Sequence, residues 1–479
     1  MANRPKVFVT DDKFPDVIAA LAARGWRRYP HLSFPKFDLK WSNYSKIAWK
    51  RVASHQIVNH FQNVTLFSQK DELAARLYRL PGEKVDGFYP RTFDMAVEAM
   101  RDVLRAWFLY YRAIGVVKAA VGEHVNAVDE ELVLLALSFL ERIVENDAFY
   151  ISLRRSCANM SALAVHDPIW MKMLRTPSAT TGTTHCSPDT VDKCCQLLRE
   201  LQERDPHVNT HVNTGMGDIW ICKPSNLSQG RGIQVMTSLE DILALQDTDP
   251  NTNESTGKED ENQDNDDQRA SIAGRKVSWV VQKYVERPLL LQDGRKFDVR
   301  QWVLITSLEP LQVYWYHECY LRFCSSPFTL DVDQLSDQFV HLSNYSVQKN
   351  AKSQRKAFSP MWTSSQFQQH LRDQHGRDVW NDDIIPQMQH ATRVAIQAVL
   401  PELRQVGRGF EWLGIDFLVD SLHRVWLLEV NVTPDVSHST EVTAALVPPA
   451  TQDTLEIVLD GEASSENRWI LMKGAEVRR

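Results

Sequence analysis

The sequence is poor in cysteine and contains no long hydrophobic run. Its 479 residues include seven cysteines, an odd number without a Cys-x2-Cys pair, which argues against a disulfide framework or a zinc module. No apolar stretch reaches the length of a membrane span, and the N-terminus shows no apolar segment of the signal-peptide type. We therefore expect a cytoplasmic protein that acts without a membrane, with a chain long enough for two or three lobes.

The negative net charge is concentrated in one segment. The formal net charge is −7, and residues 247–267 carry nine acidic side chains against one lysine, so the rest of the chain is nearly neutral. The segment 246–270 also lacks aromatic residues, which predicts a disordered loop. This loop is either a solvated spacer or a mimic of an acidic peptide substrate, which would compete with that substrate for its binding site.

Two short apolar runs near the C-terminus predict an antiparallel hairpin with polar strand ends. They occupy residues 414–420 and 425–434 and are separated by a polar turn. Period-two alternation puts Glu429 and Asn431 on one face, and Asp416 can join them from the partner strand. Such oxygen ligands suit Mg²⁺ bound together with nucleotide phosphates better than they suit zinc. The alternative is an ordinary hairpin with acidic ends.

A lysine and two glycines upstream predict a phosphate-binding lid. The strand at 218–224 carries Lys223, and the turn that follows contains Gly230, Arg231 and Gly232. Glycines let backbone N–H groups approach phosphates, and Lys223 would neutralise their charge. A plain hairpin turn is the alternative meaning of the two glycines.

Two further strands would complete a nucleotide cleft. The β-rich run 279–286 can present backbone groups and an apolar wall to adenine. The next strand places Lys296, Asp298 and Arg300 on one side, opposite a buried side. A charge cluster of this kind needs either a ligand or ion pairs.

These ordered elements resemble the ATP-grasp ligases of the tubulin tyrosine ligase-like family. The resemblance spans roughly residues 55–455 and is carried by seven motifs, at residues 58–61, 88–91, 220–224, 296–302, 320–323, 341–349 and 429–431. Residues 361–367 and 437–443, together with the long helical insertion before the lysine strand, look most like the glycylase branch. The resemblance implies a mixed α/β (α+β) fold of the ATP-grasp type, with the nucleotide between a central and a C-terminal lobe.

The resemblance also implies an ATP-dependent isopeptide synthesis on tubulin. A glutamate γ-carboxylate in a tubulin tail would take the γ-phosphoryl group of ATP, and the amine of free glycine would attack the acylphosphate. The expected activity is that of a tubulin monoglycylase that initiates the chain, with elongation left open. A glutamylase or tyrosine ligase of the same family and a tubulin-binding pseudoligase are the alternatives. The expected place of action is the microtubule cytoskeleton, including the axoneme of cilia, and the expected state is a monomer.

Position by position, the resemblance assigns residues to ATP, to magnesium and to the substrates. The residues expected to contact ATP are Lys223, Gly230, Arg231, Gly232, Gln282, Lys283, Tyr284, Val285, Lys296, Asp298 and Asn344. Asp416, Glu429 and Asn431 would bind Mg²⁺. Arg300 and Arg322 are the catalytic candidates for the anionic intermediate and the amino acid carboxylate, because a guanidinium offers a bidentate fork; ion pairs across a sheet are the alternative. His341 and Ser343 would line the same cleft.

Two features concern charge near the site and substrate recognition. Asp435 adds a negative charge close to the metal ligands, where it would weaken phosphate binding or face solvent.

A glutamate-rich tail needs a cationic track. One is offered near the N-terminus by Lys36, Lys40, Lys46, Lys50 and Arg51, interleaved with aromatic residues. The same pattern could serve nucleic acid, but no stacking module or zinc finger accompanies it, so nucleic acid is not an expected partner.

The predicted organisation has three lobes and a tail. An N-terminal βα lobe covers residues 1–86, and a central lobe with the helical insertion, the lid and the acidic loop covers 87–285. The C-terminal ATP-grasp lobe with the Mg²⁺ site covers 286–457, and a tail follows at 458–479. Helices are expected at residues 14–24, 92–120, 128–145, 189–202 and 382–403.

Overall fold

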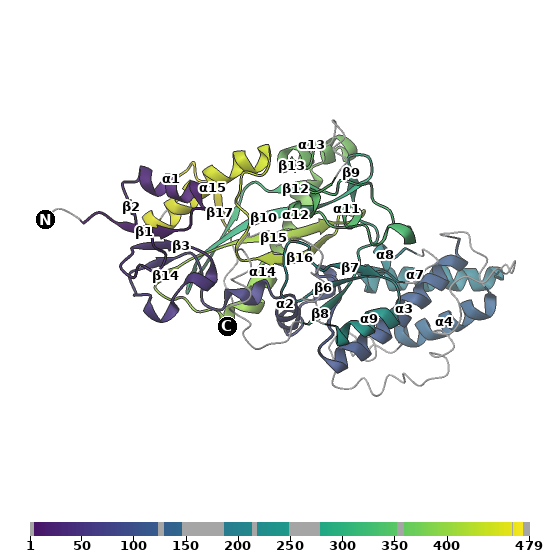
Figure 1. Ribbon diagram of the computed structural model, residues 1–479. Coiled ribbons are helices and arrows are strands. Elements are labelled where there is room, and N and C mark those ends of the chain that lie inside the picture. The colour runs from purple at the N-terminus through teal and green to yellow at the C-terminus, as the bar shows by residue number, and fades with distance from the viewer. Residues whose placement is uncertain are drawn as a thin grey trace.

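Three β-sheets organise the described part of the chain into a mixed α/β fold (Figure 1). The computed structural model describes residues 4–122, 129–145, 186–212, 218–248, 278–351, 359–461 and 463–472. Nearly all of the acidic segment 246–270 lies outside these residues, so its disorder and its two alternative roles stay predictions. In the part of the chain that is described, no helix combines the length and apolar character needed to cross a membrane.

The N-terminal sheet is parallel and takes its last strand from the distant C-terminal half. Its order is β14-β4-β3-β1-β2, and every pair in it is parallel. The strands are β1 (Val7–Thr10), β2 (Arg27–Arg28), β3 (Leu39–Trp41), β4 (Ile57–Val58) and β14 (Arg408–Gly409). Helix α1 (Pro15–Ala23) connects β1 to β2 and starts with proline, which is favourable at a first helical position.

The large sheet is antiparallel and is built around the 14-residue strand β10 (Arg295–Leu308). β10 pairs with β11 (Leu311–Tyr316), β12 (Tyr320–Phe323) and β15 (Glu411–Val419). The remaining strands are β9 (Leu290–Leu291), β13 (Met361–Thr363), β16 (Val425–Asn431) and β17 (Trp469–Leu471). Strands β15 and β16 form the predicted antiparallel hairpin.

Helices cover both faces of the large sheet. One face packs on α2 (Lys70–Leu77), α13 (Ser364–His375) and α14 (Ile385–Val399) through the largest apolar core. The other face packs on α15 (Glu441–Asp460), whose buried side also contacts α1. Buried apolar side chains between Phe61 and Tyr89 belong to the core of the large sheet. The sequence placed those up to residue 86 in the N-terminal lobe and the last two in the central lobe, and these boundaries stay predictions.

The small sheet carries the helical insertion. Its order is β5-β8-β6-β7, with all pairs antiparallel, and its strands are β5 (Thr92–Asp94), β6 (Trp220–Pro224), β7 (Gln234–Met236) and β8 (Trp279–Lys283). The described helices of the insertion are α3 (Glu98–Ala120), α4 (Glu130–Glu145) and α7 (Pro188–Arg204). Figure 1 shows these helices together at the end of the molecule opposite the N-terminal sheet. The predicted helix 92–120 starts late because its first residues pair with β8 instead.

Short elements complete the described chain. Helices α8 (Pro206–Thr210) and α9 (Leu239–Ala244) follow the insertion and the lid, and α11 (Gln338–His341) and α12 (Tyr345–Gln348) follow β12. The 3-10 turns are Tyr44–Lys46, Trp49–Arg51, Val64–Phe67, Val85–Gly87, Leu245–Asp247, Val332–Gln334 and Leu400–Glu402. A π-helical turn, Trp380–Ile384, precedes α14, so the predicted helix 382–403 is divided into three parts.

Candidate active site

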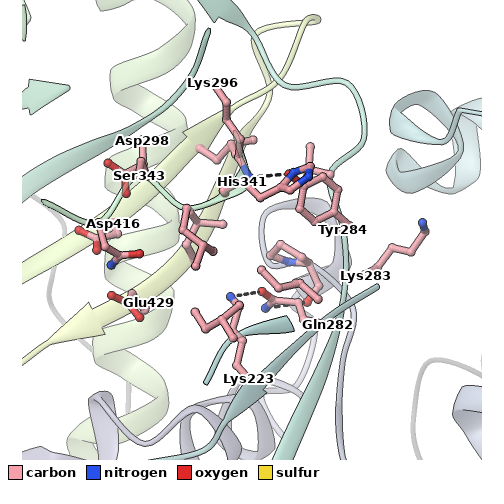
Figure 2. Close-up of a pocket in the computed structure, with 18 residues that line it drawn as sticks. Lys223, Gln282, Lys283, Tyr284, Lys296, Asp298, His341, Ser343, Asp416 and Glu429 are labelled. Carbon is pink, nitrogen blue, oxygen red and sulfur yellow. Dashed lines mark hydrogen bonds between the residues drawn. The ribbon is translucent and has the colours of Figure 1, made fainter. Parts of the chain in front are cut away.

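A pocket of about 650 Å³ lies between the small sheet and the large sheet. Figure 2 shows its polar side chains, with Asp298, Asp416 and Glu429 on one side and Lys223 and Gln282 on another. The predicted site residues that line it are Lys223, Gln282, Lys283, Tyr284, Val285, Lys296, Asp298, His341, Ser343, Asn344, Asp416 and Glu429. The structure therefore brings together residues that are as far as two hundred positions apart in the chain.

The metal-ligand candidates meet as the hairpin register requires. Asp416 lies directly opposite Glu429, and Asn431 lies opposite Gly414. The Asn431 amide nitrogen donates to Asp416 Oδ2 at 3.4 Å and to Glu429 Oε1 at 3.3 Å. A half-turn of this amide would add its oxygen to the carboxylate oxygens, since the two ends of an amide are assigned from their hydrogen bonds. Among the described residues, no group of three or more His, Cys, Asp or Glu side chains is placed to hold a metal ion by itself. The set fits Mg²⁺, which takes few protein ligands and completes its shell with phosphate and water.

Two buried arginines hold Asp416. Arg300 donates to Asp416 through Nε and through Nη2, the latter at 3.0 Å. Arg322 donates from Nη2 to the same carboxylate at 2.8 Å and binds Asp298 with both ends of its fork. Burial by itself would raise the pKa of Asp416, but the two guanidinium groups outweigh it and lower that pKa to about 2. Asp416 is therefore ionised and ready to act as an oxygen ligand.

The arginines reach the cavity only through their carboxylate partners. Neither Arg300 nor Arg322 lines the pocket, and their contacts are the ion pairs across the sheet that the sequence left as an alternative. A glycine at 414 makes room for this arrangement, because a Cβ there would lie 3.1 Å from Nη1 of Arg300. Their catalytic role stays a prediction.

Buried lysines line the part of the pocket that faces the carboxylates. Lys223 donates to Gln282 Oε1 at 2.7 Å, and Lys296 donates to Tyr284 Oη and to the His341 carbonyl, both at 2.9 Å. Burial lowers the pKa of Lys223 and of Lys296 to about 8 each. A cation that is destabilised by burial gains from an anionic ligand, so these two side chains favour a phosphate between them and the metal ligands.

A third lysine was missed by the sequence analysis. Lys70 starts α2 and is buried, and its ammonium donates to the Leu227 carbonyl at 2.6 Å while its backbone N–H donates to the Ser225 carbonyl. Burial lowers its pKa, and the Glu429 carboxylate counteracts that effect. Lys70 thus fixes the lid loop beside the candidate metal ligands. Its position about 150 residues upstream of the lid gave no local signal.

The lid rests on α12 rather than on the cavity wall. Gly230 and Gly232 have φ of +76° and +68°, the left-handed region that glycine adopts readily. A Cβ on Gly230 would lie 2.9 Å from Val347 Cγ2, and Ser346 Oγ donates to the Gln229 carbonyl at 2.9 Å. The predicted phosphate contacts Gly230, Arg231 and Gly232 lie outside the pocket lining, so their role in binding ATP stays a prediction.

The predicted adenine wall contains one side chain that faces the other way. Figure 2 shows Lys283 extending away from the cavity. Its ammonium donates to the Ile219 carbonyl at 3.0 Å, pairs with Glu286 and lies 5.0 Å from the ring centre of Tyr111 on α3. Only the backbone of Lys283 is therefore available to a ligand in the pocket. The apolar walls, which sequence reasoning did not single out, are Pro90, Ile221, Ile233, Leu342, Leu418 and Leu428.

One residue of the predicted cationic track is structural. Lys40 is 4% exposed, and its ammonium donates to the carbonyls of Leu32 and Lys46. It cannot contact an acidic tail at the surface, so its assignment to the track is wrong. Lys46 lies 3.5 Å from Asp11, and Lys50 is exposed, so the part of these two in substrate binding stays a prediction.

Asp435, the extra acidic residue, is exposed. Its carboxylate accepts a hydrogen bond from the backbone N–H of Ser437 at 2.9 Å. It does not line the pocket. This placement agrees with the alternative in which the side chain faces solvent.

Comparisons with known proteins agree with the resemblance. The family described as "Tubulin-tyrosine ligase family" matches residues 147–467. The chain is 27% identical to "Tubulin glycylase 3B" of Tetrahymena thermophila over 95% of its own length and 43% of that protein. It is 36% identical to human "Tubulin monoglycylase TTLL3" over 56% of the chain and 32% of that protein, and 35% identical to mouse "Protein monoglycylase TTLL8" over 56% and 29%. The chain thus spans less than half the length of these relatives.

Proposed function

The chain belongs to the tubulin-tyrosine ligase family, and on that premise we propose that it is an ATP-dependent ligase that joins glycine to glutamate side chains of tubulin tails. The observation that carries the proposal is the meeting of Asp416, Glu429 and Asn431 with the buried lysines Lys223 and Lys296 across one cleft. The names of the relatives supply glycine and tubulin.

The reaction consists of two displacements that need no nucleophile from the protein. An oxygen of the glutamate γ-carboxylate attacks the γ-phosphorus of ATP, and ADP leaves. The neutral amine of glycine then attacks the carbonyl carbon of the acylphosphate, phosphate leaves, and the nitrogen loses a proton. Catalysis therefore comes from positioning and from neutralising charge.

The chain's own residues divide this work. Lys223 and Lys296 lie where they would balance the charge of the nucleotide phosphates, and Ile221, Leu418 and Leu428 form the apolar walls that an adenine ring needs. Asp416 and Glu429, with the Asn431 amide, would hold Mg²⁺, which supplies charge neutralisation at the phosphates when bound.

Arg300 and Arg322 both contact the Asp416 carboxylate at the edge of the proposed site. Each is held by carboxylates, Arg300 by Asp416 and Arg322 by Asp298 and Asp416. A ligand that takes over the Asp416 oxygens would free the N–H groups of each arginine that now bind this carboxylate, and these groups would then bind an anion. Both arginines stay charged, because the carboxylates raise the pKa of each despite burial. We propose that they then stabilise the acylphosphate and the glycine carboxylate.

The test is a competition between amino acids. Tubulin or axonemes would be incubated with the protein, Mg²⁺, ATP and equal amounts of glycine, glutamate and tyrosine, and the tail peptides would be analysed by mass spectrometry. We expect a mass increment of one glycine residue on tail glutamates, and Glu429→Gln should abolish it. An increment of glutamate or tyrosine would overturn the choice of amino acid, and no increment of any kind would overturn the proposed function. For the place of action we propose the microtubule cytoskeleton, cilia included, where tubulin tails are accessible.

A further inference from the structure

A second, aromatic hollow lies where the N-terminal sheet meets the large sheet. It measures about 310 Å³. We name it the aromatic hollow, after the four rings in its wall, which are Phe14, Trp41, Phe410 and Trp412. The loop that follows Asn431 closes the remaining side with Thr433, Pro434 and Val436. The hollow is thus formed jointly by the N-terminal lobe and by the continuation of the metal-binding strand.

The register of β15 connects the aromatic hollow to the candidate active site. Side chains two positions apart in a strand share a face, so Trp412, Gly414 and Asp416 lie in one row along β15. With a rise of about 3.3 Å per residue, four residues separate the two ends of this row by about 13 Å. Arg300 lies between them, next to the position of a Gly414 Cβ, which would also lie 2.8 Å from Pro434. The hollow is therefore the next space along the same sheet face beyond the arginines.

Polar side chains also line the hollow, namely Asn59, His60 and Thr433, and Asn59 and His60 are held by Ser42 and Glu411. Trp412 is 5% exposed, and among the described residues its indole nitrogen finds no hydrogen-bond acceptor. A buried donor without a partner is unfavourable in a folded protein. A ligand that brings an apolar side chain would fill the space between the rings.

The N-terminal lobe that forms one wall of the hollow carries an excess of positive charge, and the loop that closes the hollow adds the exposed Asp435. Residues 1–60 contain eleven lysines and arginines against four aspartates, although the chain as a whole is negative. One of these cations, Lys13, lies with its ammonium 5.2 Å from the ring centre of Phe14 in the hollow wall. A lobe with this excess of positive charge attracts acidic peptides and does so most strongly at low salt.

We propose that the aromatic hollow binds an apolar side chain of the acidic acceptor peptide, roughly three to five residues from the glutamate that is modified. This inference rests on the proposed function, because it takes the modified glutamate to lie beside Asp416 and the arginines. An extended peptide advances about 3.3 to 3.6 Å per residue, so about four residues cover the row from Asp416 to Trp412. The ligase thus selects the sequence around its glutamate as well as the negative charge.

The test uses aspartate-rich peptides with a single glutamate and one leucine placed between about two and seven residues from it on either side. Affinity would be measured by fluorescence anisotropy of labelled peptides, and modification by mass spectrometry. We expect a leucine at the matching distance to lower the Kd about ten-fold relative to the same peptide with alanine, as burial of one apolar side chain allows. Val436→Trp should fill the hollow and bring this ratio to about one.

The control variant is Val97→Trp, because Val97 is 41% exposed on the helical insertion and the exchange is chemically the same. It should keep the ten-fold ratio, which separates filling of the hollow from a general effect of tryptophan. Equal affinity for the leucine and alanine peptides at every spacing would overturn the inference while modification of the peptides continued. A leucine preference without modification would support the hollow and count against the ligase. If Val436→Trp instead raised the KM for glycine alone, the hollow would be the amino acid site and the inference would be wrong.

Discussion

Lys283 and Lys223 allow a direct comparison, because both were assigned to ATP from the sequence and the structure separates them. Lys223 lines the cavity, whereas the ammonium of Lys283 is enclosed by the insertion and pairs with Glu286. Replacing Lys283 by methionine leaves the Glu286 carboxylate, 1% exposed, without its cation. Removal of one partner of a buried ion pair costs about 3 to 5 kcal/mol. We expect Lys283→Met to lower the free energy of unfolding by that amount and to change the Kd for ATP little.

Lys223→Met should behave in the opposite way. A charge-assisted hydrogen bond is worth about 1.5 to 3 kcal/mol, which corresponds to a Kd for ATP that is raised about ten- to hundred-fold. Its unfolding free energy should change less than that of Lys283→Met, because burial already destabilises the charged form of Lys223. The measurements are urea unfolding and titration with a fluorescent ATP analogue at a temperature where both variants are folded.

A double-mutant cycle isolates the ion pair. Adding Glu286→Gln to Lys283→Met removes the unpaired charge, so the double variant should recover about 2 kcal/mol of what the single variant lost. The Glu286 carboxylate also accepts from the Val212 backbone at 2.6 Å, and glutamine retains an acceptor there. Our reasoning would be refuted if Lys283→Met left stability unchanged and weakened ATP binding as strongly as Lys223→Met.

Three further predictions concern the metal ligands, the lysines and the lid. Glu429→Gln should remove the tightening of ATP binding by Mg²⁺, by about ten-fold or more in Kd; calorimetry that finds the tightening intact would rule out the metal assignment. The pKa of Lys223 and of Lys296 is about 8 in the free protein, and bound phosphate should raise both values. ATP should therefore bind with full affinity below pH 8 and more weakly as the pH rises through 8 and above. A constant Kd between about pH 7 and 9.5 would contradict this. Gly230→Ala should weaken ATP binding because its Cβ would collide with the helix under the lid, whereas Gly376→Ala has similar backbone strain, of about 1 kcal/mol, but meets nothing within 4 Å and should affect stability alone.

The hairpin that carries the three proposed metal ligands could be predicted because its signal is local. Asp416, Glu429 and Asn431 lie on two strands joined by a short turn, so strand alternation and the usual hairpin pairing were enough to bring them together. The same reasoning placed Lys296 and Asp298 on one face of β10. Strand alternation does not tell which residue lies opposite on the neighbouring strand of the sheet. The ion pairs of Arg300 and Arg322 with Asp416 therefore remained one of two alternatives.

The errors have a common cause in long-range packing. Lys40 has the surroundings of a surface residue in the sequence, but two carbonyls from its own lobe enclose its ammonium. The helix expected from residue 92 loses its first residues because Thr92 pairs with Gln282, 190 positions away. The apolar pocket residues outside 279–286, such as Leu418 and Leu428, were not recognised because a leucine in a cleft and a leucine in a core have the same pattern in a sequence.

The strand that completes the N-terminal sheet also determines when, during synthesis, the N-terminal lobe can finish folding. β14 reaches the edge of β4 only after about 350 further residues have been synthesised, and the same stretch brings Glu411 to the buried His60, 351 positions away. A nascent chain therefore carries an open parallel edge, the kind that invites pairing with other chains, for most of its synthesis. Fragments that stop before residue 408 keep that edge permanently. The N-terminal lobe should then be recovered as a folded unit only together with the second half of the chain, and expression of the lobe alone should give aggregates.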